Sequence, residues 1–324
     1  MLKILPEESI DSFYTRNLIY LQRASADELK ADICLSPKLY GWNIEVLAKM
    51  AKSMGLPDDK GTSLLINKHT NYMSSSLVER DLKNRALQPS NEGLREFIRR
   101  RINRQDVIKM CPVCAKEDHR GIGVVYGRRI HQHSLVEVCP YHNVGLLHKC
   151  QTCKITFCIE NNSCVQIWRP CECGLEVFDR VPSRNEDQWL LALAQFSNDI
   201  NTSERKYLQA GVIGLIVTKI LGGQLTGNAK EDLVSLEKFF EVESSEYVAS
   251  RFRIALKKIF DDLYRQPLSW DEYIVLLCVI FKDYKCFQNA AKDFNIPERT
   301  SSLIEWSLRV DYGFSYLAPP VMES

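Results

Sequence analysis

A regular stripe of apolar residues marks a long helix in the C-terminal half of the chain, over residues 245–266. Its apolar positions recur every three or four residues, which is the spacing of one helix face. They are Val248, Phe252, Ala255, Leu256, Ile259, Phe260 and Leu263. The next helix is expected to begin at the capping sequence Ser269-Trp-Asp-Glu272 and to end near Lys282. Both helices predict a buried helical core.

The first 109 residues carry shorter helical patterns. A helix is predicted from Pro6 to Leu21, because proline is favoured in the first turn of a helix. Its apolar stripe consists of Ile10, Phe13, Tyr14, Leu18 and Leu21. Two further helices, over residues 44–54 and 64–69, have the outline of a helix-turn-helix, which any antiparallel helix pair shares. We therefore expect an N-terminal helical, helix-turn-helix-like domain over residues 1–109.

The chain becomes helical again after residue 180, and a C-terminal helical domain is expected over residues 181–324. Near its end, residues 287–308 contain small alanines, a turn at Asn295–Pro297 and an apolar second segment, which together predict another helix-turn-helix-like pair. DNA contact and a partner or dimer surface are both open for this pair. Three isolated cysteines, Cys34, Cys278 and Cys286, are interpreted as small core residues.

Cysteines cluster between these two helical regions: nine of the twelve lie between residues 111 and 173. They form two sets of four candidate metal ligands, because two residues between ligands let one turn present both to the same ion. The first set is Cys111, Cys114, Cys139 and His142, and the second is Cys150, Cys153, Cys171 and Cys173. Cys158, Cys164 or His148 is an alternative ligand in the second set. The pattern predicts tandem zinc ribbons over residues 110–180.

Zinc suits these sets better than disulfides. The N-terminus lacks the apolar run of a secretory signal, and the longest apolar runs are too short to span a bilayer, so a cytoplasmic protein without a membrane segment is expected. Clustered cysteines in a reducing compartment bind metal more often than they pair. We expect two Zn²⁺ per chain, and a small hairpin of residues 124–126 and 135–138 at the first site.

The charge of the chain is nearly balanced, with 42 Lys and Arg residues against 41 Asp and Glu. Residues 80–133 are locally basic, with 13 Lys and Arg residues against six Asp and Glu. Partner or phosphate contacts are therefore hypothesised for Arg99, Arg100, Arg128, Arg129 and His131. The alternative is that these arginines pair within the chain.

Motifs for enzymes are absent from the sequence. The segment Gly222–Gly227 is not followed by the lysine of a phosphate-binding loop, and no H-x-E or H-E-x-x-H sequence occurs. A set of four protein ligands also leaves a metal no open position for substrate. We therefore expect a protein that is not an enzyme.

Three segments resemble the TniQ family of transposon target-selection proteins. One is Cys111-Pro-Val-Cys114 with Glu117 and Asp118. The second is Arg128-Arg129-x-His131-Gln132 followed by Cys139-Pro-x-His142. The third, near the start, runs from Pro6 through Glu8, Ser9, Ile10, Ser12 and Phe13 to Arg16. Their order, with a second cysteine set behind them, makes the resemblance specific over residues 6–175.

The resemblance implies a non-enzymatic adaptor in transposition. Some family members form a homodimer on a CRISPR effector complex, Cascade, whose guide RNA reads the target DNA, and link it to a TnsC-like AAA+ ATPase regulator and the transposase. The balanced charge and the short segment after the cysteines favour this CRISPR-associated kind. The alternative is a TnsD-like selector that binds target DNA by sequence, and a third reading is a metal-dependent nuclease.

Overall fold

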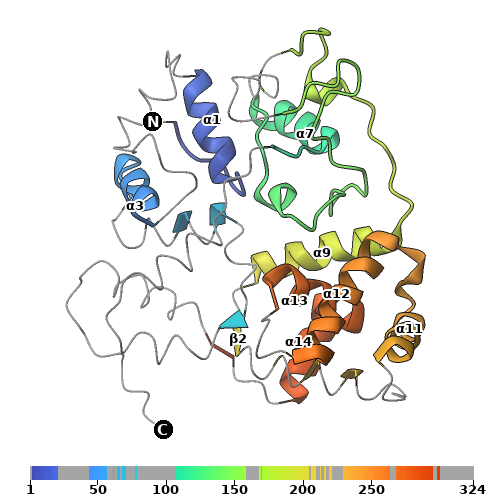
Figure 1. Ribbon diagram of the computed structural model, residues 1–324. Helices are drawn as coiled ribbons and strands as arrows, with labels where there is room; N and C mark the ends of the chain where they lie inside the picture. Colours follow the sequence, from blue (N-terminus) through green and yellow to red (C-terminus); the bar gives the residue numbers. More distant parts are fainter. Residues whose placement is uncertain are drawn as a thin grey trace, which may run out of the picture.

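In the computed structural model, the described part of the chain is mainly helical and has very few strands (Figure 1). The described residues are 2–20, 44–56, 61, 64–65, 68–70, 77–78, 107–157, 168, 170–203, 206–208, 212, 215–216, 219–220, 229–262, 268–294 and 298–299. The mainly helical fold class expected from the sequence is confirmed at this level. None of the helices in these residues is long and apolar enough to cross a membrane.

The largest apolar core of the described residues lies in the C-terminal part of the chain and includes five helices with described bounds (Figure 1). They are α9 (Gln188–Thr202), α11 (Ala229–Phe239), α12 (Glu246–Asp262), α13 (Trp270–Phe281) and α14 (Tyr284–Asp293). Helix α13 contacts α9, α12 and α14. Residues 273–279 are all buried because these helices surround them. A helix that is apolar on every side is stable only when it is surrounded in this way.

Capping groups fix where these helices begin. At α13, Ser269 Oγ accepts a hydrogen bond from Glu272 N, and the Glu272 carboxylate accepts one from Ser269 N at 2.7 Å. At α9, the Asp187 carboxylate accepts bonds from Trp189 N and Leu190 N. Each cap satisfies backbone donors that the first helical turn leaves free. The predicted capping box and the apolar stripe of α12 are both confirmed, the stripe by Val248, Phe252, Ala255 and Leu256.

The N-terminal part contains α1 (Ile10–Tyr20) and α3 (Ile44–Ser53). The predicted start of α1 at Pro6 is wrong by four residues. Glu7 adopts a positive φ of 56°, and Glu8 forms an antiparallel bridge with Arg128, so the chain here follows another segment before it turns into the helix. The predicted apolar face is confirmed by the buried side chains of Ile10, Phe13 and Tyr14.

A three-stranded sheet joins distant parts of the chain. Strand β2 (Lys206–Leu208) lies in the middle, parallel to β1 (Leu77–Val78) and antiparallel to β3 (Glu298–Arg299). Residues 298–299 thus form a strand directly after the predicted turn at 295–297. The second helix predicted for residues 287–308, and the middle of the pair predicted at 44–69, lie largely outside the described residues, and neither helix-turn-helix is confirmed.

The cysteine-rich region has α7 (Pro112–Ile122) and the short 3-10 helices η2 (Arg129–Gln132) and η3 (Val177–Asp179). The predicted hairpin of residues 124–126 and 135–138 is wrong, because η2 separates the two segments and Val138 instead bridges Gly145. A further 3-10 helix, η4 (Val242–Ser244), precedes α12. One of the isolated cysteines also differs from expectation: Cys278 is buried, but Cys286 is exposed on α14 and Cys34 lies outside the described residues.

Candidate metal centres

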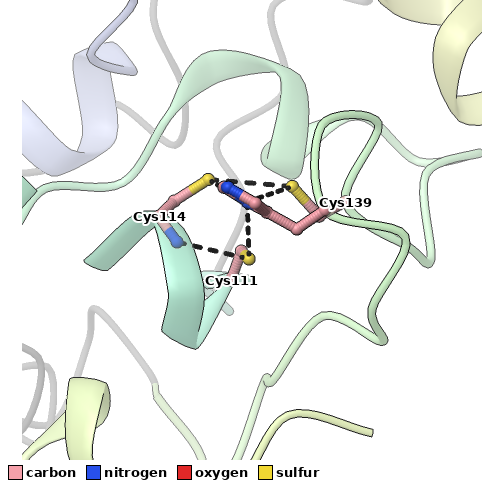
Figure 2. A group of neighbouring side chains, drawn as sticks. Cys111, Cys114 and Cys139 are labelled. Carbon is pink, nitrogen blue, oxygen red and sulfur yellow. Dashed lines mark hydrogen bonds between the residues drawn. The ribbon is translucent and has the colours of Figure 1, made fainter. Parts of the chain in front are cut away.

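The start of helix α7 brings together the first two ligands of the first set. Cys111 is the N-cap, Pro112 occupies the first helical position, and Cys111 Sγ accepts a hydrogen bond from Cys114 N at 3.5 Å. Proline suits this position because its fixed φ is already helical and its missing N–H is not needed there. Both sulfur atoms therefore point to one side of the helix start (Figure 2).

Cys139 lies on a turn that faces the start of the helix (Figure 2). His142, three residues later, completes the set. The turn is closed by hydrogen bonds from Cys139 N to Val144 O at 2.8 Å and from Asn143 N to Cys139 O at 3.0 Å. Asn143 adopts a positive φ of 51°, which asparagine tolerates better than most residues. The local backbone thus places a thiol and an imidazole opposite the two thiols of α7.

The four ligand atoms have the spacing of a tetrahedral zinc site. Cys114 Sγ lies 3.7 Å from Cys139 Sγ, and His142 Nδ1 lies 3.6 Å, 3.3 Å and 3.5 Å from the sulfurs of Cys111, Cys114 and Cys139. Zn–S bonds of about 2.3 Å and Zn–N bonds of about 2.0 Å in a tetrahedron place sulfurs about 3.8 Å apart and sulfur and nitrogen about 3.5 Å apart. The residues present therefore fit a zinc ion.

Two neighbouring side chains support these ligands. Glu117, one helical turn beyond Cys114, lies 3.2 Å from His142 Nε2, so the ring donates there and turns Nδ1 toward the sulfurs. His131 is completely buried, and its Nε2 lies 3.9 Å from Cys114 Sγ. Such contacts fix the tautomer and orientation of a ligand. The hypothesis of a phosphate-facing His131 conflicts with this burial.

Crowding of the thiols favours a bound cation. Hydrogen bonding to Cys111 and Cys139, together with burial, raises the pKa of the Cys114 thiol. Hydrogen bonds with Cys111 and Cys114 lower the pKa of the Cys139 thiol to about 3. A divalent cation bound by this set would hold all three sulfurs as thiolates.

The second set converges in a similar way. Cys150 and Cys153 lie on a turn in which Cys153 N donates to Cys150 Sγ at 3.4 Å, and residues 149 and 156 form a bridge at its base. Cys171 and Cys173 lie on a turn that contains Gly174 at a φ of 81°. The sulfurs of Cys150 and Cys173 are 3.6 Å apart, and those of Cys153 and Cys171 are 3.0 Å apart.

All four ligand atoms of each set lie within 4.8 Å of one another, so both sets are compatible with one metal ion each. These are the same eight residues that the spacing predicted. His148, proposed as an alternative ligand, is exposed and belongs to neither set. Cys158 and Cys164 lie outside the described residues.

The predicted basic surface differs from what the structure describes. Arg128 forms an ion pair with Asp118 at 2.6 Å and lies over the rings of Tyr126 and Tyr141. Arg129 is only 1% exposed and pairs with Glu7 at 2.9 Å. The alternative of pairing within the chain is therefore correct for both arginines. Arg99 and Arg100 lie outside the described residues.

Arg129 also joins three parts of the chain. Its backbone N donates to Glu7 O at 2.7 Å, and its Nη2 lies 3.5 Å from Asn201 O on α9. Nearby, the Gln132 side chain accepts a hydrogen bond from Lys109 N and donates one to Lys109 O. These bonds hold the segment that leads into Cys111. The segment Arg128-Arg129-x-His131-Gln132 thus anchors the first metal site to its surroundings.

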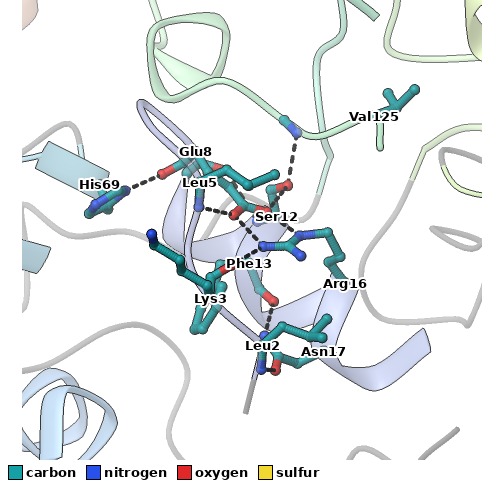
Figure 3. Close-up of polar contacts among 12 residues, drawn as sticks. Leu2, Lys3, Leu5, Glu8, Ser12, Phe13, Arg16, Asn17, His69 and Val125 are labelled. Atoms are coloured by element: carbon teal, nitrogen blue, oxygen red, sulfur yellow. Dashed lines mark hydrogen bonds and ion pairs between the residues drawn. The ribbon is translucent and has the colours of Figure 1, made fainter. Parts of the chain in front are cut away.

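The N-terminal motif docks onto this same segment (Figure 3). Arg16 pairs with the fully buried Glu8, and Ser12 Oγ accepts a hydrogen bond from Gly127 N at 2.8 Å. Ser9 N donates to Gly127 O at 2.8 Å. Two motifs that are more than 100 residues apart in the sequence therefore form one joint.

We expect Gly127→Ala to weaken this joint by about 1–3 kcal/mol, the usual cost of overpacking. A Cβ at residue 127 would meet Ser12 Cβ at 3.1 Å and Ile108 Cγ2 at 3.3 Å. The matched control is Gly121→Ala in α7, where an added Cβ meets nothing within 4 Å and alanine favours the helix. Urea unfolding of both variants tests this, and equal stability of the two would contradict it.

His133 lies where the metal region meets the C-terminal helices. Its ring is buried, Nδ1 accepts from Leu135 N at 3.2 Å, and neighbouring Ser134 donates to Asp271 of α13 at 2.6 Å. Burial lowers the pKa of His133 to about 4, which Asp271 opposes and Lys109 reinforces. The folded protein therefore keeps this ring neutral in a pH range where an unfolded chain protonates it.

This histidine is expected to make the folded state less stable as the pH is lowered. An unfolded histidine has a pKa of about 6.5, so between pH 7.5 and 5.5 the unfolded state gains the proton and the folded state loses about 1.4 kcal/mol of stability. His133→Asn keeps a hydrogen-bond acceptor and should remove this loss. His148→Asn, at an exposed ring, should retain it. Urea midpoints at both pH values decide, and identical pH profiles for both variants would refute the expectation.

Comparison with known proteins gives a family for the N-terminal part of the chain. No curated protein matches the sequence. Residues 1–146 match the model of the TniQ family, a range that contains the N-terminal motif, the joint at Gly127 and the whole first ligand set. The resemblance seen in the sequence motifs is confirmed for this part of the chain: residues 1–146 are similar to the TniQ family.

Proposed function

We propose that this protein is a non-enzymatic adaptor for transposition target selection that holds two structural zinc ions. It would link an RNA-guided CRISPR effector of the Cascade type to a TnsC-like AAA+ regulator and the transposase. The TniQ match over residues 1–146 carries the proposal, because the family implies a role in target selection. The proposed division of the chain is 1–109, 110–180 and 181–324.

The zinc ions would be structural. Each set offers four protein ligands, Cys₃His in one and Cys₄ in the other, and such closed sets leave no position for substrate. The first set lies beside Gly127 and the Arg128–Gln132 segment, so its ion would hold the surface onto which α1 docks. The metal would supply folding energy to a region with a small apolar core.

Electrostatics favour an adaptor over a protein that reads DNA alone. The chain carries 42 basic and 41 acidic residues, and two arginines of the basic stretch, Arg128 and Arg129, are paired with Asp118 and Glu7. Sequence-specific DNA binders obtain much of their affinity from unpaired basic groups on phosphates. We propose that target DNA is reached through Cascade, by a homodimer of this chain, in the cytoplasm.

A reconstitution tests these proposals together. The purified protein should contain two zinc ions by elemental analysis, sediment as a dimer, recover Cascade and the ATPase in pull-downs, and shift free target duplex weakly in gels. A strong, sequence-dependent and salt-sensitive shift without Cascade would instead favour the TnsD-like reader. Failure to recover either protein partner would overturn the adaptor proposal, and DNA cleavage by the metal-loaded chain would indicate a nuclease.

A further inference from the structure

Arg180 lies buried beside the second ligand set, although no carboxylate pairs with it among the residues that the structure describes. Only 4% of it is exposed, and its Nη1 donates to Cys150 Sγ at 2.6 Å. Its Nη2 donates to Leu175 O at 3.4 Å. The central carbon of the guanidinium lies over the Phe157 ring, 5.6 Å from the ring centroid. Its Nε is buried without a partner.

The contact and the burial of the guanidinium suit a negatively charged sulfur. A buried guanidinium without a counter-ion costs several kcal/mol, and a neutral thiol is a weak acceptor that would not repay this cost. A thiolate at Cys150 repays it through a charge-assisted hydrogen bond. Thiolate is also the form in which cysteine binds zinc.

The two sets differ in the charge that they would carry with zinc. Three thiolates and one imidazole around Zn²⁺ give a net charge of about −1, whereas four thiolates give about −2. Arg180 faces the second set, and its positive charge offsets one of these two negative charges. The ligands of the first set are supported instead by Glu117 and His131.

We propose that Arg180 is the positioning and charge-balancing residue of the second zinc site, and that it controls how tightly this site retains its metal. The inference rests on the proposed zinc occupancy. Contacts of this kind change metal affinity by about 10–100-fold. Loss of Arg180 should therefore weaken the second site by that factor and leave the first site unchanged.

The test compares Arg180→Gln, Arg180→Lys and the control Arg184→Gln, which changes an exposed arginine nearby. Zinc-loaded full-length proteins are titrated with a competing chelator, and native mass spectrometry counts the ions while alkylation shows which cysteines are released. Arg180→Gln should release the second ion at about 10–100-fold lower chelator concentration. Arg180→Lys, which keeps the charge, should release the second ion at a chelator concentration nearer to that of wild type. Arg184→Gln should release it at the wild-type concentration.

Cadmium-substituted protein gives a second readout. The ¹¹³Cd resonance of the four-sulfur site should shift in Arg180→Gln, and the resonance of the Cys₃His site should not. If Arg180→Gln is insoluble, Arg180→Lys is compared with wild type: weaker retention of the second ion supports the inference, and retention equal to wild type contradicts it. Wild-type retention in Arg180→Gln, or equal loss in the glutamine and lysine variants, would overturn the inference. Fewer than two ions in the wild-type protein would instead overturn the zinc proposal on which it rests.

Discussion

Replacing Cys111 by serine is expected to leave the protein with one zinc ion and an unfolded first metal region. Cys111 is both a ligand and the N-cap of α7, where its sulfur accepts a hydrogen bond from Cys114 N. Serine is among the best N-cap residues, so this variant preserves the cap while it removes the thiolate. Any loss is then due to the missing ligand and not to the helix start.

The expected effect exceeds the reserve of stability. Structural zinc supplies about 10–16 kcal/mol of apparent binding free energy, whereas a domain is stable by about 5–15 kcal/mol in total. Cys111→Ser should therefore be largely insoluble, with the soluble fraction containing one zinc ion. The matched control is Cys286→Ser, which changes an exposed cysteine outside both sets. A folded Cys111→Ser protein that retains two ions would show that Cys111 is not an essential ligand of a structural metal.

Sequence spacing predicted which eight residues converge in two groups because each pair is a local feature. Two residues between Cys111 and Cys114 fix one turn, and the same holds for Cys150 and Cys153, so the geometry follows from the neighbouring backbone. Helices α12 and α13 were predicted for a similar reason: periodicity and a capping box act within a few turns. Local rules gave reliable predictions where local contacts decide the structure.

The supporting residues could not be predicted in this way. Arg180, His131 and Arg129 act through contacts with residues 17 to 122 positions away in the chain, which no spacing rule relates. The run Arg128-Arg129 looks like an exposed basic patch in the sequence, yet Arg129 is buried beside Glu7 and Arg128 is partly buried beside Asp118. A charged residue is usually exposed, but it can be buried when a residue of opposite charge pairs with it.

The start of α1 shows the same competition between local and distant contacts. Pro6 suits the first turn of a helix, but residues 7–9 instead bond to the backbone of residues 127–129. Those bonds connect the N-terminal part to the first metal site, so the helix begins only at Ile10. The buried pair of Glu8 and Arg16 holds this arrangement, and it makes a second large effect predictable (Figure 3).

Glu8→Gln is expected to destabilise the N-terminal part by about 3–5 kcal/mol, because it leaves a buried guanidinium without its counter-ion. Glu8 is fully buried and accepts two bonds from Arg16 at 2.8 Å, one from Leu5 N and one from Ser12 Oγ. Glutamine has nearly the same shape, but its amide group would place a donor against donors. Urea unfolding of the purified variant measures the loss.

An exposed pair in the same protein serves as the control. Glu246 is 81% exposed and pairs with Arg253 at 3.2 Å, so Glu246→Gln should change stability by about 0–1 kcal/mol. The double variant Glu8→Gln/Arg16→Met removes both buried charges and should recover part of the stability lost in Glu8→Gln, since the unpaired cation is gone. If Glu8→Gln costs no more than Glu246→Gln, the pair does not hold the N-terminal motif on the metal region, and the backbone bonds to residues 127–129 must do so alone.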